Sequence, residues 1–260
     1  MKPQLQVALI QTNLVWENPL QNRLNLNDKL EHLNSGVDLV VLPELFTSGF
    51  TMSPEIVAES MEGETIQWLK HWASKKQCAI TGSLVIKERE VFRNRMVFVK
   101  PNGDLSYYDK RHSFTLAGEH KVYTSGKEKV IVDYKGFKIC LQICYDLRFP
   151  VFSRNQNDYD VLIYVANWPK VRVEAWSALL KARAIENMSY CIGVNRVGLD
   201  ANNHEYSGHS AAFDGLGQSI STILPYKEQV EVVTLDKEAL ETLRTKLNFL
   251  SDADEFTLHV

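Results

Sequence analysis

Three side chains could together carry out acyl transfer through a thioester: Cys144, Glu44 and Lys110, each following an extended apolar segment. A cysteine attacks a carbonyl carbon as a thiolate, and its free pKa of about 8.5 leaves little thiolate at neutral pH unless a base or cation lies nearby. Glu44 could accept the thiol proton. The Lys110 ammonium could favour the thiolate and stabilise an oxyanion, as could the backbone N–H of Tyr145.

Each of these residues also has an interpretation without chemistry. A cysteine at the end of a buried strand is more often a core side chain than a nucleophile. Glu44 could cap a helix or face solvent, and Lys110, inside the run DKRH, could belong to a surface charge cluster. Only the combination of the three favours catalysis.

The elements that must position these residues alternate between strands and helices. Some strands are joined by helices and others by tight turns, which predicts mixed sheets with helices packed over them. The region 209–235 is expected to form hairpins with a turn at 215–217. The strands are predicted at 7–10, 37–44, 78–86, 96–99, 105–108, 130–132, 137–143, 161–165 and 191–195, and the helices at 19–34, 64–76, 172–189 and from Asp236.

The bulk composition describes a chain able to form one large domain. Its 260 residues are 45% hydrophobic, and no linker rich in Pro, Gly or Ser divides them, so a single domain over 1–260 is predicted. The net charge of −3 and the absence of a basic block argue against a nucleic-acid partner. A small neutral or anionic metabolite is the expected ligand.

Targeting, redox and metal signals are weak in this sequence. The N-terminus lacks the apolar core of a signal peptide, and no apolar stretch reaches the roughly 18 residues needed to cross a bilayer, so we expect a cytoplasmic protein without membrane contact. The four cysteines have no CxxC spacing and should be free thiols. No metal-binding motif is found, and no cofactor is expected.

Three ordered blocks resemble those of the nitrilase superfamily of carbon–nitrogen hydrolases. They are LPE at 42–44, YDKRHSF at 108–114 and ICYDLRFP at 143–150, and the likeness extends to ANWP at 166–169 and ARAIEN at 182–187. The resemblance implies an α/β fold, a four-layer α-β-β-α sandwich with mixed sheets. It also implies a homodimer that pairs through helices near the cysteine, with helix 172–189 a candidate face.

The resemblance also assigns roles. It implies that Cys144 is the nucleophile, Glu44 the general base and Lys110 the oxyanion-stabilising cation. Many members have a second glutamate that orients the lysine and the substrate, and Glu119 stands a short way past Lys110 in this sequence.

Within the superfamily, CYDLRFP together with DKRHSF resembles the omega-amidase and Nit-type branch. This implies hydrolysis of the omega-amide of 2-oxo dicarboxylic acid monoamides, namely 2-oxoglutaramate and 2-oxosuccinamate, with release of ammonia. Other Nit-type activities, on deaminated glutathione or carbamoyl substrates, and a nitrilase activity stay open because they differ in pocket shape and share the triad.

Such a substrate carries a carboxylate at its far end, which requires a cation. Arg148 is the nearest candidate, because a guanidinium binds a carboxylate through two parallel hydrogen bonds. Three other arginines are rivals, and aromatic side chains at strand ends could form the pocket walls. The rivals are Arg111, Arg172 and Arg196, and the aromatic residues are Phe114, Tyr145 and Trp168.

Other classes of protein fit the sequence less well. A Cys-His hydrolase would pair Cys144 with His112 or His209. A cysteine phosphatase needs a glycine-containing phosphate loop after the cysteine, which is absent here. A binding protein that kept the fold without the chemistry would not need the intact set of Glu44, Lys110 and Cys144.

Overall fold

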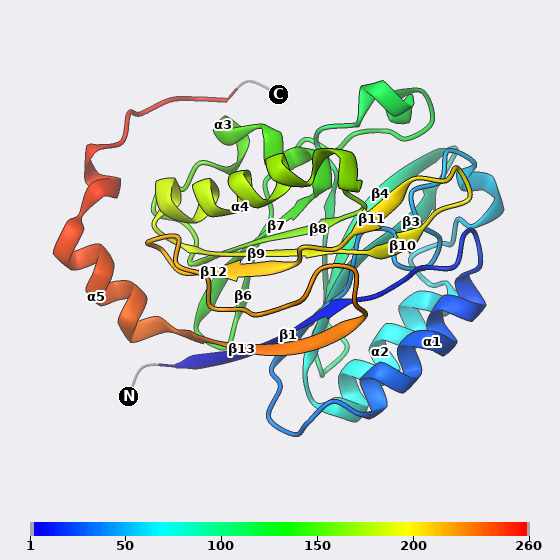
Figure 1. Cartoon of the computed structure of the whole chain (residues 1–260), viewed down its shortest axis with the longest axis horizontal. Coiled ribbons are helices and arrows are strands. Elements are labelled where there is room, and N and C mark those ends of the chain that lie inside the picture. The colour runs from blue at the N-terminus through cyan, green and yellow to red at the C-terminus, as the bar shows by residue number, and fades with distance from the viewer. Residues whose placement is uncertain (1–2, 259–260) are drawn as a thin grey trace.

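Two mixed β-sheets lie face to face between layers of helices in the computed structural model, which describes residues 3–258 (Figure 1). One hydrophobic core contains buried side chains from both sheets. Helices α1 (Pro19–Glu31) and α2 (Glu64–Lys76) cover the outer face of one sheet, and α4 (Val173–Asn187) covers that of the other. The predicted four-layer α-β-β-α sandwich with mixed sheets is confirmed.

The first sheet contains six strands in the order β13-β1-β2-β3-β4-β5. β1 pairs in parallel with β2, and β2 with β3, whereas the other neighbours are antiparallel. β1 is apolar on both faces: Val7 and Leu9 enter the core between the sheets, while Ala8 and Ile10 enter the core beneath α1 and α2. The bounds are β1 Gln4–Gln11, β2 Leu39–Val41, β3 Ala79–Glu88, β4 Val91–Val99, β5 Leu105–Asp109 and β13 Gln229–Asp236.

The second sheet contains five strands in the order β12-β9-β8-β7-β6. The central strands β7, β8 and β9 are parallel, so their carboxyl ends lie at one edge of the sheet, where α/β proteins commonly place their sites. The small hairpin β10-β11 stands apart from both sheets. The bounds are β6 Ile131–Tyr134, β7 Phe137–Ile143, β8 Val161–Ala166, β9 Tyr190–Asn195, β10 Val197–Leu199, β11 Glu205–Ser207 and β12 Ala211–Phe213.

The helix α4 lies close against β9 because the strand has a glycine there. A Cβ at Gly193 would lie 2.3 Å from Leu180 Cδ1 and 2.7 Å from Trp176 Cζ2.

No helix of residues 3–258 is long and apolar enough to cross a membrane. The remaining helices are α3 Pro150–Ser153 and α5 Lys237–Leu247, and the 3-10 helices are η1 Pro54–Ile56, η2 Thr115–Ala117, η3 Glu119–Lys121, η4 Cys144–Arg148, η5 Lys170–Arg172 and η6 Phe249–Asp252.

The predicted elements differ from the observed ones mainly near the C-terminus. The turn predicted at 215–217 is confirmed, because Phe213 and Ser219 form an antiparallel bridge across it. The prediction of hairpins over the rest of 209–235 is wrong, because β12 pairs with β9 in one sheet while β13 pairs with β1 in the other. β2 ends at Val41, earlier than predicted, and the β10-β11 hairpin was not predicted. The prediction that the N-terminus lacks a signal peptide begins at Met1 and Lys2, which lie outside the described residues.

Candidate active site

Cys144, Lys110 and Glu44 meet just beyond the ends of three strands. Cys144 directly follows β7, Lys110 directly follows β5, and Glu44 comes shortly after β2. Lys110 Nζ lies 2.9 Å from Glu44 Oε1, and the Cys144 thiol is near enough to Glu44 and Lys110 for both charges to shift its pKa. All three side chains are buried. The structure therefore brings the three predicted residues together and rules out a surface position for Lys110.

Glu119 completes the surroundings of the lysine. Lys110 Nζ lies 3.0 Å from each carboxylate oxygen of Glu119. The second glutamate is fully buried at the start of η3, and the backbone N–H of Phe114 donates to it. Lys110 is thus held between two carboxylates. Glu119 contacts the lysine in the way that the resemblance implied.

Two asparagines that were not predicted as site residues hold the carboxylates. Asn94 Nδ2 donates to Glu44 Oε1 at 2.8 Å and lies 3.4 Å from Glu119 Oε1. The backbone N–H of Asn167 donates to Glu44 Oε2 at 2.7 Å, and its Nδ2 donates to the Glu44 carbonyl at 2.6 Å. Asn94 is 2% exposed but stands between Arg93 and Arg95 in β4, so its sequence context gave no signal.

The backbone at Cys144 is in an unusual conformation. Its φ of 45° lies in the left-handed region, which costs a non-glycine residue roughly 1–3 kcal/mol. The strand β7 stops at this residue and the 3-10 helix η4 begins. The sharp turn places Cys144 in the lining of a pocket, with its Sγ 4.0 Å from the carbonyl oxygen of Asn167.

The charges around Cys144 favour the neutral thiol. Burial raises the pKa of this thiol well above its ordinary value, the charge of Glu44 raises it further, and Lys110 opposes them only in part. Lys110 lowers the pKa of the thiol, as expected, but burial and the two carboxylates together outweigh it. Those carboxylates, Glu119 and Glu44, raise the pKa of Lys110 well above its usual range although burial lowers it. Burial also raises the pKa of Glu119.

Asp146 joins the segment that carries Lys110 to the start of η4. Its Oδ2 accepts hydrogen bonds from Tyr108 Oη at 2.8 Å and from the Ile143 N–H at 2.9 Å. Its Oδ1 accepts from the His112 N–H at 2.9 Å and lies 2.8 Å from His112 Nδ1. The buried carboxylate thus contacts residues on both sides of the lysine and the residue before the cysteine, a role that was not predicted.

The two histidines of the Cys-His alternative have other partners. His112 contacts Asp146 and stacks on Phe149, with ring centroids 3.9 Å apart. His209 Nδ1 lies 3.1 Å from Ser207 Oγ. Within the described residues no hydrogen bond joins either histidine to Cys144, so the geometry does not support that alternative.

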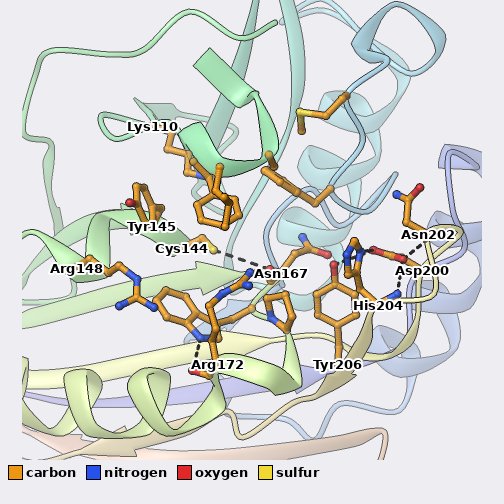
Figure 2. Close-up of a pocket in the computed structure, with 17 residues that line it drawn as sticks. Lys110, Cys144, Tyr145, Arg148, Asn167, Arg172, Asp200, Asn202, His204 and Tyr206 are labelled. Carbon is orange, nitrogen blue, oxygen red and sulfur yellow. Dashed lines mark hydrogen bonds and ion pairs between the residues drawn. The ribbon is translucent and has the colours of Figure 1, made fainter. Parts of the chain in front are cut away.

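A pocket of about 380 Å³ opens over Cys144 and Lys110 (Figure 2). The predicted wall residues Phe114, Tyr145 and Trp168 all line it. The Phe114 and Tyr145 rings meet edge to face, with centroids 5.0 Å apart. Aromatic walls of this kind suit a small substrate with an apolar middle section.

The four candidate arginines separate into two groups. Arg148 and Arg172 line the pocket, whereas Arg111 and Arg196 do not. Arg111 Nη1 faces the carbonyl of Gly126 at 3.4 Å. Arg196 is fully buried, and its Nη2 donates to backbone carbonyls of neighbouring loops. These two rivals are therefore in structural positions.

The unpredicted hairpin β10-β11 supplies the far wall of the pocket. Asp200, His204 and Tyr206 line it (Figure 2). The Asp200 carboxylate accepts hydrogen bonds from Tyr206 Oη at 2.9 Å and from the backbone N–H of Asn202 at 2.8 Å. Among residues 3–258, no group of three or more His, Cys, Asp or Glu side chains could hold a metal ion.

Comparisons with known proteins agree with this geometry. The model of the carbon–nitrogen hydrolase family matches residues 6–245. The omega-amidase YafV of Yersinia enterocolitica is 43% identical over 256 residues, 98% of each chain. The 2-oxoglutaramate amidase of Paenarthrobacter nicotinovorans is 33% identical over 267 residues, covering 96% of this chain and 89% of its own.

The fold also matches a solved structure along its whole length. The crystal structure of XC1258 from Xanthomonas campestris, a CN-hydrolase superfamily protein with an arsenic adduct in its active site, superposes with a TM-score of 0.96. It is 42% identical and covers 99% of this chain and 100% of its own. The chain therefore belongs to the carbon–nitrogen hydrolase family of the nitrilase superfamily, as its three sequence blocks predicted.

Proposed function

We propose that the protein is an omega-amidase that releases ammonia from 2-oxoglutaramate and 2-oxosuccinamate through a thioester on Cys144. The observation that carries this proposal is the Cys144 thiol, buried against Glu44 at the edge of a pocket, with Lys110 held beside it by two carboxylates. The relatives named omega-amidase and 2-oxoglutaramate amidase support the same reaction.

In the acylation step, Glu44 accepts the thiol proton while the Cys144 sulfur attacks the amide carbon. A carbon–sulfur bond forms, and the amide oxygen becomes an oxyanion near Lys110 Nζ and the backbone N–H of Tyr145. Tyr145 lies in the first turn of η4, where backbone N–H groups have no preceding helical carbonyl to bind. Glu44 then gives its proton to the leaving nitrogen, the carbon–nitrogen bond breaks, and ammonia departs.

In the deacylation step, a water molecule replaces the ammonia. Glu44 accepts one proton of this water as its oxygen attacks the thioester carbon, and the carbon–sulfur bond breaks. The proton returns to the Cys144 sulfur, so the products are one carboxylic acid and one ammonia for each amide and water consumed. Glu119 keeps Lys110 oriented throughout, through its two contacts with Nζ.

The pocket fits the rest of the substrate. Phe114 and Trp168 are proposed to enclose its methylene carbons, and Arg148 to contribute positive charge near its charged end. Arg148 is suited to this because its guanidinium lies 4.8 Å from the centroid of the Trp168 ring, in the pocket lining.

The decisive experiment measures ammonia release from a panel of substrates. The panel contains 2-oxoglutaramate, 2-oxosuccinamate, deaminated glutathione, a carbamoyl amino acid and a simple nitrile. Wild type should act best on the two 2-oxo acid amides, and Cys144→Ala should release no ammonia. Full turnover by Cys144→Ala would refute the thioester mechanism, and activity on the nitrile alone would refute the substrate class.

We further propose that the protein acts in the cytoplasm as a homodimer that pairs through α3 and α4. Val151 on α3 and Ile185 on α4 are exposed apolar residues, 53% and 47% accessible, which favours this face as an interface. Sedimentation at micromolar concentration should give a dimer. Val151→Glu combined with Ile185→Glu should give a monomer, whereas a wild-type protein that sediments as a monomer would exclude the dimer.

A further inference from the structure

Two guanidinium groups in the pocket lack a charge partner. Within the described residues, neither Arg148 nor Arg172 forms an ion pair, and neither side chain forms a hydrogen bond. The other cation of the pocket, Lys110, is already paired with Glu44 and Glu119. The free charge of the pocket is therefore positive.

The acidic residue of the pocket lining does not neutralise these arginines. Asp200 Oδ1 accepts hydrogen bonds from the backbone N–H groups of Asn202 at 2.8 Å and His204 at 3.0 Å. Its Oδ2 accepts from Tyr206 Oη and lies 3.2 Å from His204 Nδ1. These contacts lower the pKa of Asp200 below its usual value although burial raises it. The Asp200 carboxylate is thus satisfied within its own hairpin.

The chain around Arg172 is fixed to the active-site frame. Trp168 Nε1–H donates to the Arg172 carbonyl oxygen at 2.7 Å, and the Arg172 N–H donates to the Pro169 carbonyl at 3.0 Å. Trp168 is itself held by Asn195, whose Oδ1 accepts the Trp168 N–H at 2.8 Å. This turn follows Asn167, which binds Glu44 directly, so the position of Arg172 is set relative to the catalytic group.

The guanidinium of Arg172 is prepared to bind a planar anion. Its Cζ lies 5.1 Å from the centroid of the Phe114 ring, which is a cation–π contact that stabilises the positive charge. A guanidinium stacked on a ring keeps its N–H groups free to form two parallel hydrogen bonds with a carboxylate.

The position of Arg172 at the start of α4 is electrostatically unfavourable unless an anion binds there. Arg172 is the N-cap of α4, and its side chain makes no capping hydrogen bond. Ser, Thr, Asp and Asn are preferred at this position, and the N-terminus of a helix carries partial positive charge that repels a cation. A residue that departs from local preference without a structural contact to compensate is expected at a functional site.

The two arginines also differ in direction. Figure 2 shows the Arg172 side chain extending toward Cys144 and Asn167, whereas Arg148 enters the pocket from η4 and its guanidinium lies over the Trp168 ring. An amide carbon bound at Cys144 therefore leaves the far end of a short substrate within the half of the pocket that Arg172 faces.

We propose that Arg172 is the specificity-determining residue that binds the carboxylate of the substrate through two parallel hydrogen bonds. Arg148 contributes a second positive charge and not the main contact. This inference rests on the proposed function, because it names the group that selects omega-amides of 2-oxo acids over uncharged amides. Arg172 takes part in binding and leaves the chemistry at Cys144 to the residues around it.

The first test compares a charged with an uncharged substrate of the same chain length, 2-oxoglutaramate and pentanamide. In Arg172→Met the KM for 2-oxoglutaramate should rise about 10- to 100-fold, the loss typical of a hydrogen-bonded charge pair, with kcat changed much less. The kcat/KM for pentanamide should stay near the wild-type value. Arg148→Met should raise the KM for 2-oxoglutaramate by a smaller factor.

The second test measures binding without turnover. Calorimetric titration of the Cys144→Ala protein with 2-oxoglutaramate gives its Kd, and adding Arg172→Met should weaken it by the same factor as KM. Arg172→Lys keeps the charge but cannot form two parallel hydrogen bonds. In the Cys144→Ala background its Kd should therefore lie between that of Cys144→Ala alone and that of the protein that also carries Arg172→Met. Arg89→Met, an exposed arginine in the turn between β3 and β4, is the matched control and should leave Kd and KM unchanged.

The outcomes separate this inference from the proposed function. Unchanged KM and Kd in both Arg172 variants would overturn the inference while leaving omega-amidase activity intact. An equal loss on 2-oxoglutaramate and pentanamide would also overturn it, because it would indicate a structural role for Arg172. If wild type hydrolyses pentanamide but not 2-oxoglutaramate, the proposed function itself fails.

Discussion

At the scale of single residues, the active site contains a buried thiol whose pKa is raised well above its ordinary value. Two carboxylates, Glu44 and Glu119, and one ammonium surround Cys144, and burial strengthens the effect of their net negative charge. In the proposed mechanism the thiol loses its proton to Glu44 as it attacks, which would keep the nucleophile protected from other electrophiles until the substrate is bound.

This electrostatic arrangement predicts the pH dependence of alkylation. The rate of Cys144 labelling by iodoacetamide should keep increasing from pH 7 to pH 9, because the pKa of the thiol lies well above its ordinary value. Intact mass should show one adduct in wild type and none in Cys144→Ala, since Cys144 lines the pocket and is 9% exposed, whereas the other three cysteines are at most 1% exposed. A rate that is constant between pH 6 and pH 8 would indicate a preformed thiolate and contradict the prediction.

The lysine between two carboxylates makes a second prediction. Lys110→Met leaves Glu44 and Glu119 buried without their shared cation, which should lower the free energy of unfolding by about 3–5 kcal/mol and abolish turnover. Lys75→Met, which removes an exposed ion pair with Glu31, should change it by less than about 1 kcal/mol. Urea denaturation of both variants measures the difference.

The same comparison has a defined pH dependence. The pKa of Lys110 is raised in the folded protein above its ordinary value of 10.5, so its contribution to stability is fully present below that value. It is lost as the pH rises through the folded pKa. The stability gap between wild type and Lys110→Met should therefore be constant from pH 7 to pH 10. A gap that closes below pH 9 would contradict this.

At the scale of elements, the site depends on connections between strand ends. β5 and β7 belong to different sheets. Asp146 joins them, because its carboxylate accepts hydrogen bonds from Tyr108 and His112, on either side of Lys110, and from the N–H of Ile143 at the end of β7. A buried carboxylate that accepts hydrogen bonds from backbone N–H groups in two segments fixes their distance more rigidly than apolar packing does.

Asp146→Asn should therefore affect both stability and catalysis. The amide nitrogen would face donors where a carboxylate oxygen accepted hydrogen bonds, which should cost about 1–3 kcal/mol of stability. The displaced Lys110 should reduce kcat more than it changes KM. Asp133→Asn, at an exposed position of β6, is the matched control and should behave as wild type. Normal kcat in Asp146→Asn would show that the connection is not needed for catalysis.

At the scale of the whole molecule, the two sheets share one core, and the site lies where they meet. Buried residues of β1, β4, β7 and β9 belong to the same hydrophobic cluster. Separating the sheets would expose the inner faces of both to water. We therefore expect the two sheets to unfold together.

The single-domain prediction follows this reasoning and can be tested by unfolding. Urea should give one cooperative transition, coincident by circular dichroism and tryptophan fluorescence. Trp72 on α2 packs into the core beneath the first sheet's helices, and Trp176 on α4 packs into the core of the second sheet, so single-tryptophan proteins retaining one or the other can report each half separately. Two transitions at different urea concentrations would indicate two domains.

Much of this arrangement could be predicted from the sequence because it depends on local patterns. The bounds of α2 were predicted to the residue, since an amphipathic repeat and flanking glycine and lysine residues are local signals. Asn94 and Asp146 could not be identified as part of the site, because their partners come from other strands. The partners of β12 and β13 were missed for the same reason, since strand pairing is a long-range choice.

By itself the sequence determined the family, the three strand-end residues Cys144, Glu44 and Lys110, and the class of reaction, because these depend on residue types in ordered blocks. Only the tertiary structure decided the direction in which the pKa of the thiol shifts, since burial, two carboxylates and one ammonium act on it together. It also decided which arginines enter the pocket. Arg111, Arg148, Arg172 and Arg196 could not be told apart in the sequence. Packing places Arg111 and Arg196 in structural contacts and leaves Arg148 and Arg172 in the pocket lining.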